Sequence, residues 1–143
     1  MEMLKSKLGK IIFARLSTGE DLLETINQVA QKNNVTAGFC ISIGTLKHAN
    51  LGFYHQGKYE TIQIDTPLEI VSCTGNVSLK ENKPFAHAHI VVSNEKGKAM
   101  GGHVMPGCVI GVTGELVLVE AADVRLHRKL DKKTQLYLWS MEK

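Results

Sequence analysis

Long apolar runs are missing from this sequence. No stretch approaches the ~18 consecutive apolar residues that a membrane-spanning helix needs, so we predict no membrane-embedded segment. The first ten residues, Met1 to Lys10, carry charges throughout and contain no apolar core of the kind found in secretory signal peptides. We therefore expect a soluble, cytoplasmic protein with no membrane partner.

Cysteine is scarce, and its spacing excludes two common roles. The chain has three cysteines, Cys40, Cys73 and Cys108, and no CxxC pair. This argues against a disulfide framework and against a cysteine-ligated zinc site. Each cysteine stands among apolar neighbours, so we predict buried free thiols in a reducing compartment. The alternative is a catalytic thiol.

Several enzyme and multidomain signatures are also absent. The sequence has no Walker loop, no dinucleotide fingerprint and no Ser-His-Asp order, and it has no internal repeat or proline-rich linker. With 143 residues, we predict one domain over residues 1–143. A domain of this length folds without a disulfide or a metal, so a metal site would have to serve function or assembly.

Charge of neither sign dominates. The formal net charge is +3 and the pI is near 8.8, with lysines spread along the chain, whereas nucleic-acid binders usually gather basic residues on one face. The densest basic stretch runs from Arg125 to Leu130 and continues in Lys132 and Lys133. We interpret it as an edge hairpin whose lysines oppose edge-to-edge pairing. Weak, salt-dependent contact with phosphates is the alternative.

One helix is predicted near the start of the chain. A short strand over residues 11–16 is followed by Ser17-Thr18-Gly19-Glu20, a capping-box pattern with a hydroxyl at the cap and a carboxylate three residues on. Apolar residues then recur at helical spacing from Leu22, and the helix should end near Asn33-Asn34. We expect Glu20 and Asp21 to serve capping, and a role near the functional site is the alternative.

The rest of the chain reads as strands. Short alternating or apolar runs cover residues 37–43, 46–54, 59–64, 68–79, 85–92, 99–104, 108–120, 124–130 and 135–140. We expect the strand over 68–79 to be broken or bulged at Gly75. The predicted fold class is α+β: a strongly bent antiparallel sheet, or a partial barrel, packed on one main helix.

Three histidines form the candidate site. In the strand over 85–92, His87 and His89 lie on one face, because side chains alternate along a strand. His103 comes from the next strand and lies on the same face if the connecting loop has an odd number of residues. Gly97 fits the left-handed position of a three-residue hairpin loop, which is the odd case. Gly101 and Gly102 allow a ligand or another backbone to approach closely.

Three imidazoles suit zinc or another divalent first-row metal and leave a position open for water or a ligand. Two functions follow: a metal-binding protein without catalysis, or a metal-dependent enzyme of unknown substrate that uses a metal-bound water. Glu115, inside an apolar strand, is a candidate general base for the second, and an edge or interface position explains it equally well. The alternative to metal binding is that His87, His89 and His103 are solvent-facing or subunit-interface residues.

The histidine pattern also carries a family resemblance. His87-Ala88-His89, then Gly97, then Gly101-Gly102-His103 resembles the signature of the plants-and-prokaryotes-conserved (PPC) domain family. Further stretches agree with that family: Arg15 with Gly19-Glu20-Asp21, Gly44, residues 67–72 with Gly75, and residues 109–115. Pro67 and Leu68 depart from it, since they stand where the family motif has Gly or Arg.

The resemblance implies a bent antiparallel sheet assembled as a homotrimer, of the stand-alone prokaryotic type. Some members of the family look as though they hold a metal on these histidines. In plants the domain is joined to AT-hook peptides that bind the DNA minor groove, and this association implies a DNA-associated or regulatory role. The present sequence has no Arg-Gly-Arg core, so the AT-hook is absent and only weak DNA binding without it is expected.

Overall fold

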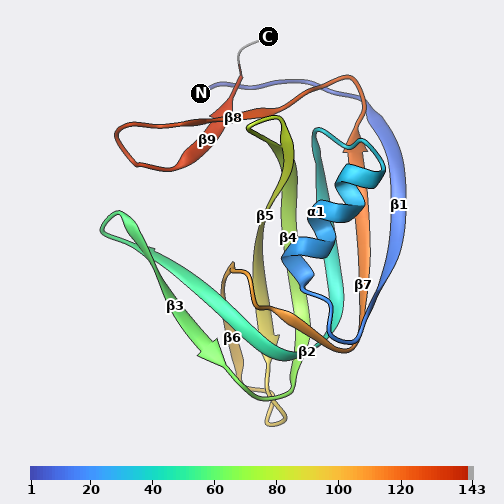
Figure 1. Cartoon of the computed structure of the whole chain (residues 1–143), viewed down its shortest axis with the longest axis vertical. Helices are drawn as coiled ribbons and strands as arrows, with labels where there is room; N and C mark the ends of the chain where they lie inside the picture. Colours follow the sequence, from blue (N-terminus) through green and yellow to red (C-terminus); the bar gives the residue numbers. More distant parts are fainter. Residues whose placement is uncertain (142–143) are drawn as a thin grey trace.

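The computed structural model describes residues 1–141, and residues 142–143 of the predicted domain lie outside the described part. The described residues form one helix and nine strands (Figure 1). They are β1 (Leu8–Ser17), α1 (Leu22–Lys32), β2 (Gly38–His55), β3 (Lys58–Ile64), β4 (Leu68–Lys80), β5 (Lys83–Ser93), β6 (Ala99–Val104), β7 (Val109–Ala121), β8 (His127–Leu130) and β9 (Tyr137–Ser140). No described helix is long and apolar enough to cross a membrane.

Strand β2 holds the sheet together. Its first half lies between β7 and β4, and its second half pairs with β3 and β6. Because β4 also pairs with β5, and β5 with β6, these strands and β2 close into a ring and the sheet bends strongly (Figure 1). The predicted α+β class with a bent sheet is therefore confirmed, and the ring is the partial barrel.

The expectation of a purely antiparallel sheet is wrong at one edge. Strand β8 pairs in parallel with β4, through Leu79 with His127 and Lys80 with Arg128. The chain leaves β7 and returns alongside β4, so that β8 runs in the direction of β4. Strand β9 then turns back antiparallel to β8, which confirms the predicted C-terminal hairpin.

Helix α1 covers part of one face of the sheet. Leu22, Ile26 and Ala30 are fully buried against the core, and the helix contacts mainly β5 and β7. On β5 the buried residues are Ala86, Ala88, Ile90 and Val92, as the alternation predicted. The helix has only eleven residues. The predicted packing of the sheet on one main helix therefore holds for this contact alone, and most of the sheet packs against its own strands.

The helix cap lies one turn later than the capping-box pattern indicated. The N-cap is Asp21, whose Oδ1 accepts the Glu24 backbone N–H at 2.9 Å. Gly19, at φ +91°, turns the chain after β1, and the Glu20 carboxylate accepts the Ser17 N–H within that turn. The helix ends at Asn33, and Asn34 has φ +56°, which confirms the predicted C-terminus.

The irregularity of β4 does not lie at Gly75. Register shifts occur between Ile70 and Ser72 against β5, and opposite them between Ser42 and Gly44 of β2. Gly75 instead permits close strand approach, since a Cβ there would lie 2.6 Å from the His87 carbonyl oxygen. Gly44, at φ +138°, lets the two predicted runs 37–43 and 46–54 continue as one strand.

Candidate metal centre

Strands β5 and β6 bring the three histidines together. His89 and His103 are directly opposite each other in the antiparallel pair. Residues 94–98 separate the two strands. The Asn94 N–H donates to the Lys98 carbonyl at 3.2 Å, which leaves the predicted three-residue loop over 95–97, and Gly97 has φ +71°. The odd loop therefore places His103 on the face of His87 and His89.

The two glycines before His103 serve strand packing. A Cβ at Gly101 would lie 2.8 Å from the Ile90 carbonyl oxygen of β5, and one at Gly102 would lie 2.9 Å from the Gly52 carbonyl oxygen of β2. Strand β6 is thus held tightly between β5 and β2. Of the two uses predicted for these glycines, approach of another backbone is the one observed, and it fixes the position from which His103 projects.

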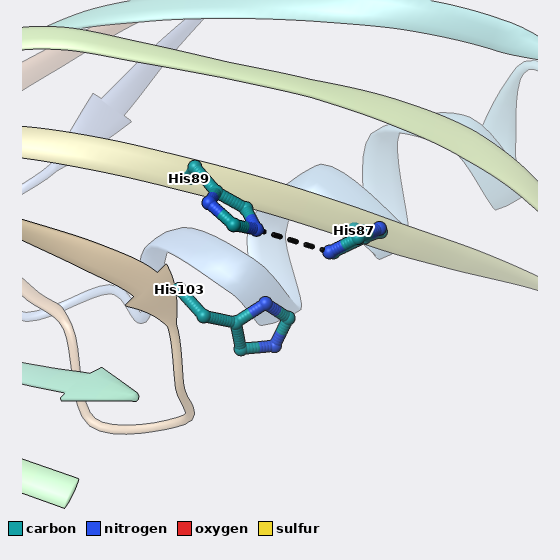
Figure 2. A group of neighbouring side chains, drawn as sticks. All are labelled: His87, His89 and His103. Atoms are coloured by element: carbon teal, nitrogen blue, oxygen red, sulfur yellow. Dashed lines mark hydrogen bonds between the residues drawn. The ribbon is translucent and has the colours of Figure 1, made fainter. Parts of the chain in front are cut away.

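The three imidazoles face one another (Figure 2). One ring nitrogen from each lies within 4.8 Å of the others. His87 Nε2 and His89 Nε2 are 3.2 Å apart, and the ring centroids of the three pairs are 5.0–5.4 Å apart. The Nδ1 atom of His103 is buried and has no hydrogen-bond partner. Figure 2 shows this nitrogen turned toward the gap between the other two rings.

Burial keeps two of these imidazoles neutral. Burial, followed by the charges of His87 and His89, lowers the pKa of His103 to about 4. Burial also lowers the pKa of His87, followed by the positive charge of Arg128 and then by His89. At neutral pH His87 and His103 therefore present ring lone pairs, which a metal ligand requires.

A cavity of about 220 Å³ opens beside the histidines. His87 and His103 form part of its wall, and the other lining residues are Tyr59, Phe85, Arg128, Gln135, Leu136, Tyr137 and Leu138. The Tyr59 ring lies 4.7 Å from the His103 ring between centroids. Sequence reasoning missed Tyr59 and placed Arg128 on a basic surface hairpin. Alternation along residues 124–130 puts Arg128 on the side of Leu126 and Leu130, away from Arg125, but it does not indicate that Arg128 reaches the histidines.

The other candidate residues lie elsewhere. Glu115 is opposite Arg15 of β1 and Ile43 of β2, so β2 and β4 separate it from the histidines of β5 and it is not a base for this site. Asp21 caps α1, and Glu20 bonds the Ser17 backbone. The expected capping role is confirmed for Asp21, whereas Glu20 lies in the turn before the helix and does not cap it.

The chain matches one protein family over most of its length. The model of the Plants and Prokaryotes Conserved domain, abbreviated PCC or PPC, matches residues 3–122. This chain belongs to that family. The match contains all three histidines and ends before β8, so the C-terminal hairpin of this PPC protein lies beyond it.

Solved PPC-like structures share the whole fold. A PPC protein of Pyrococcus horikoshii is 34% identical, with a TM-score of 0.90 and coverage of 100% of this chain and 99% of that one. The metal-containing protein AF0104 of Archaeoglobus fulgidus is 31% identical, with a TM-score of 0.90 and coverage of 98% and 99%. A candidate DNA-binding protein of Ralstonia eutropha is 25% identical, with a TM-score of 0.81 and coverage of 91% and 90%.

Curated relatives are much longer proteins. The chain is 32% identical over 121 residues to the bifunctional protein GlmU of Synechococcus sp. strain JA-3-3Ab, and this covers 84% of the chain. The match takes up only 18% of that relative, so the chain spans about a fifth of the length of the curated protein. The region similar to this chain is therefore one part of a larger protein there.

Proposed function

We propose that this PPC protein binds a divalent first-row metal, with zinc the first choice, through His87, His89 and His103. The observation that carries the proposal is the buried His103 Nδ1, which has no hydrogen-bond partner and is turned toward the other two imidazoles. A buried polar atom without a partner costs free energy, and a metal ion would provide the partner. The metal-containing Archaeoglobus relative supports the same assignment.

The spacing of one nitrogen pair fits zinc. Two Zn–N bonds of ~2.0–2.1 Å at a tetrahedral angle place their nitrogens roughly 3.3 Å apart, and His87 Nε2 and His89 Nε2 are 3.2 Å apart. Three imidazole ligands would leave one position open to water or a ligand. In that position a zinc ion supplies Lewis-acid chemistry.

Metal content tests this assignment. We expect about one metal ion per chain in protein purified without a metal-affinity tag, measured by mass spectrometry, and none in the His87→Ala/His89→Ala/His103→Ala variant. His55→Ala is the matched control, because His55 is exposed and lies outside the cluster. Absence of metal from the parent protein, or equal metal in the triple variant, would contradict the proposal. Circular dichroism establishes that the variants are folded.

A binding role fits the site better than hydrolysis. A metal-bound water that acts as a nucleophile is usually assisted by a general base within hydrogen-bond reach. Among residues 1–141, no carboxylate lines the cavity beside the histidines. We therefore place the metal-dependent enzyme second. A DNA-associated role rests on the Ralstonia relative, and its expected signature is salt-sensitive binding to duplex DNA.

We propose that the protein assembles as a homotrimer through one face of the sheet. We define the apolar face by five exposed residues: Ile11, Phe13, Phe39, Ile41 and Ile43. Between 49% and 78% of the surface of each residue is exposed. Directly opposed residues form a continuous row across the strands: Phe13, Val117, Ile41, Thr74, His89 and His103. The apolar face and the histidines therefore share one side of the sheet, and a partner chain would cover an apolar surface that water otherwise contacts.

A further inference from the structure

The cavity beside the histidines has walls of two kinds. One wall holds His87 and His103 of the proposed metal centre, and the opposite wall comes from the β8–β9 hairpin, which crosses the end of β4 (Figure 1). The apolar part of the lining comes from Phe85, Leu136 and Leu138, and Gln135 adds an amide. With about 220 Å³, the cavity is smaller than the roughly 300–1,000 Å³ of drug-sized sites, and its size suits a ligand with a single ring.

Arg128 brings a positive charge to this cavity. Its guanidinium is half-buried, and it donates to Ser78 Oγ at 2.7 Å, to Asn76 Oδ1 at 2.8 Å and to the Tyr137 carbonyl at 2.9 Å. All three acceptors are neutral. A guanidinium has five N–H donors, so two remain after these bonds. Asn76 is directly opposite His87 in the β4–β5 pair, which puts Arg128 next to the metal centre.

The charges around the cavity are unbalanced. A divalent ion held by three neutral imidazoles keeps its full charge, and Arg128 adds a further positive charge in a partly desolvated place, where like charges repel strongly. No described carboxylate lines the cavity. The exposed Glu81 accepts the Tyr137 hydroxyl at 3.2 Å but is not a lining residue. An anion between the two cations would remove this repulsion.

We propose that the cavity binds a small organic acid, whose carboxylate lies between Arg128 and the metal and whose apolar body packs against Phe85, Leu136 and Leu138. The inference rests on the proposed metal centre, because the metal supplies the second positive charge. Arg is well suited to the position, since its planar fork matches a carboxylate in two hydrogen bonds. Arg128 and the hairpin wall follow residue 122, where the family match ends, so the histidines alone do not define this ligand site.

Benzoate and benzamide form a suitable pair of probes, because they share a shape and differ in charge. We expect the metal-loaded protein to bind benzoate at least about tenfold more strongly than benzamide, as charge-assisted hydrogen bonds imply. Arg128→Gln should weaken benzoate binding by about the same factor. The matched control is Arg125→Gln, which removes the same charge from an exposed residue outside the cavity and should leave benzoate binding unchanged. Affinities are measured by NMR titration.

The outcomes separate the anion site from the metal centre. Equal affinity of the parent protein for benzoate and benzamide overturns the inference even if Arg128→Gln fails to fold. Unchanged benzoate binding in a folded Arg128→Gln variant also overturns it, whatever the metal content. Zinc content measured in the same samples tests the metal proposal separately. Bound zinc together with equal affinity for benzoate and benzamide would support the metal centre and contradict the anion site.

Discussion

At the scale of single residues, burial decides which side chains can react. The three cysteines are buried, and none lies in the histidine cluster. Burial raises the pKa of Cys40 to about 11 and that of Cys73 to about 12, and it also raises the pKa of Cys108. A thiol attacks other groups as the thiolate. These cysteines are therefore packing residues, as their apolar neighbours in the sequence indicated.

The cysteines should resist modification in the folded protein. At pH 8 we expect no measurable reaction with Ellman's reagent under native conditions, because all three thiols are buried and burial raises the pKa of each one. All three cysteines should react once the protein is unfolded in guanidinium. Rapid release of one or more equivalents from the native protein would show an accessible thiolate and contradict this account.

The sequence predicts the positions of the site histidines but not the position of Arg128. The alternation of His87 and His89 and the odd loop ending at Gly97 depend only on neighbouring residues, so they could be predicted. Arg128 could not be assigned to the site in the same way. Its position depends on hydrogen bonds to Ser78 and Asn76, about fifty residues earlier in the chain, and no local pattern encodes that contact.

At the scale of elements, the continuity of β2 depends on one glycine. Gly44 has φ +138°, and a Cβ there would lie only 2.3 Å from the Thr113 carbonyl oxygen of β7. Without this residue the strand could not pass its register shift while staying between β4 and β7. Two runs that looked like separate strands in the sequence are for this reason a single element.

Gly44→Ala should therefore be strongly destabilising. We expect a loss of about 3 kcal/mol or more in the free energy of unfolding, since backbone strain and a backbone clash add. Gly19→Ala is the control: Gly19 has φ +91° but no atom near the added Cβ, so strain alone should cost about 1 kcal/mol. Urea unfolding of both variants measures the difference. Equal losses would show that the contact with Thr113 is easily relieved.

Element boundaries were predictable where local chemistry sets them. The turn at Gln56-Gly57, the end of α1 at Asn33 and the loop at Gly97 all follow from residues that accept positive φ or cap a helix. The start of α1 was predicted one turn too early, because Ser17 and Glu20 match a capping box. Gly19 instead turns the chain at that point, and Asp21 caps the helix. The parallel pairing of β8 with β4 was out of reach, because it depends on the path of the chain after β7.

At the scale of the whole molecule, the apolar face should decide the oligomeric state. Ile41 lies at the centre of this face, between Val117 and Thr74 in the row across the sheet. A charge there would have to be desolvated in the assembled protein. We therefore expect the parent protein to have three times the chain mass of 15.7 kDa by light scattering, and Ile41→Lys to be monomeric.

The control for this prediction is Ile62→Lys. Ile62 lies on β3, is 57% exposed and stands outside the apolar face, so its replacement should leave the mass unchanged. A monomeric parent protein would contradict the proposed trimer. If both lysine variants dissociate, the interface includes β3 and is wider than the face defined above.

The pairing of β1 has a consequence for how the protein is made. Of the strands described here β1 leaves the ribosome before the others, yet the strand it pairs with is β7, about a hundred residues later. The nascent chain therefore carries an unpaired apolar strand until β7 emerges, and the first half of β2 lacks one of its neighbours for the same time. Closing such distant pairs is slow. The sheet can close only after β7 has emerged, so the histidine strands β5 and β6 emerge before the sheet that holds them is closed.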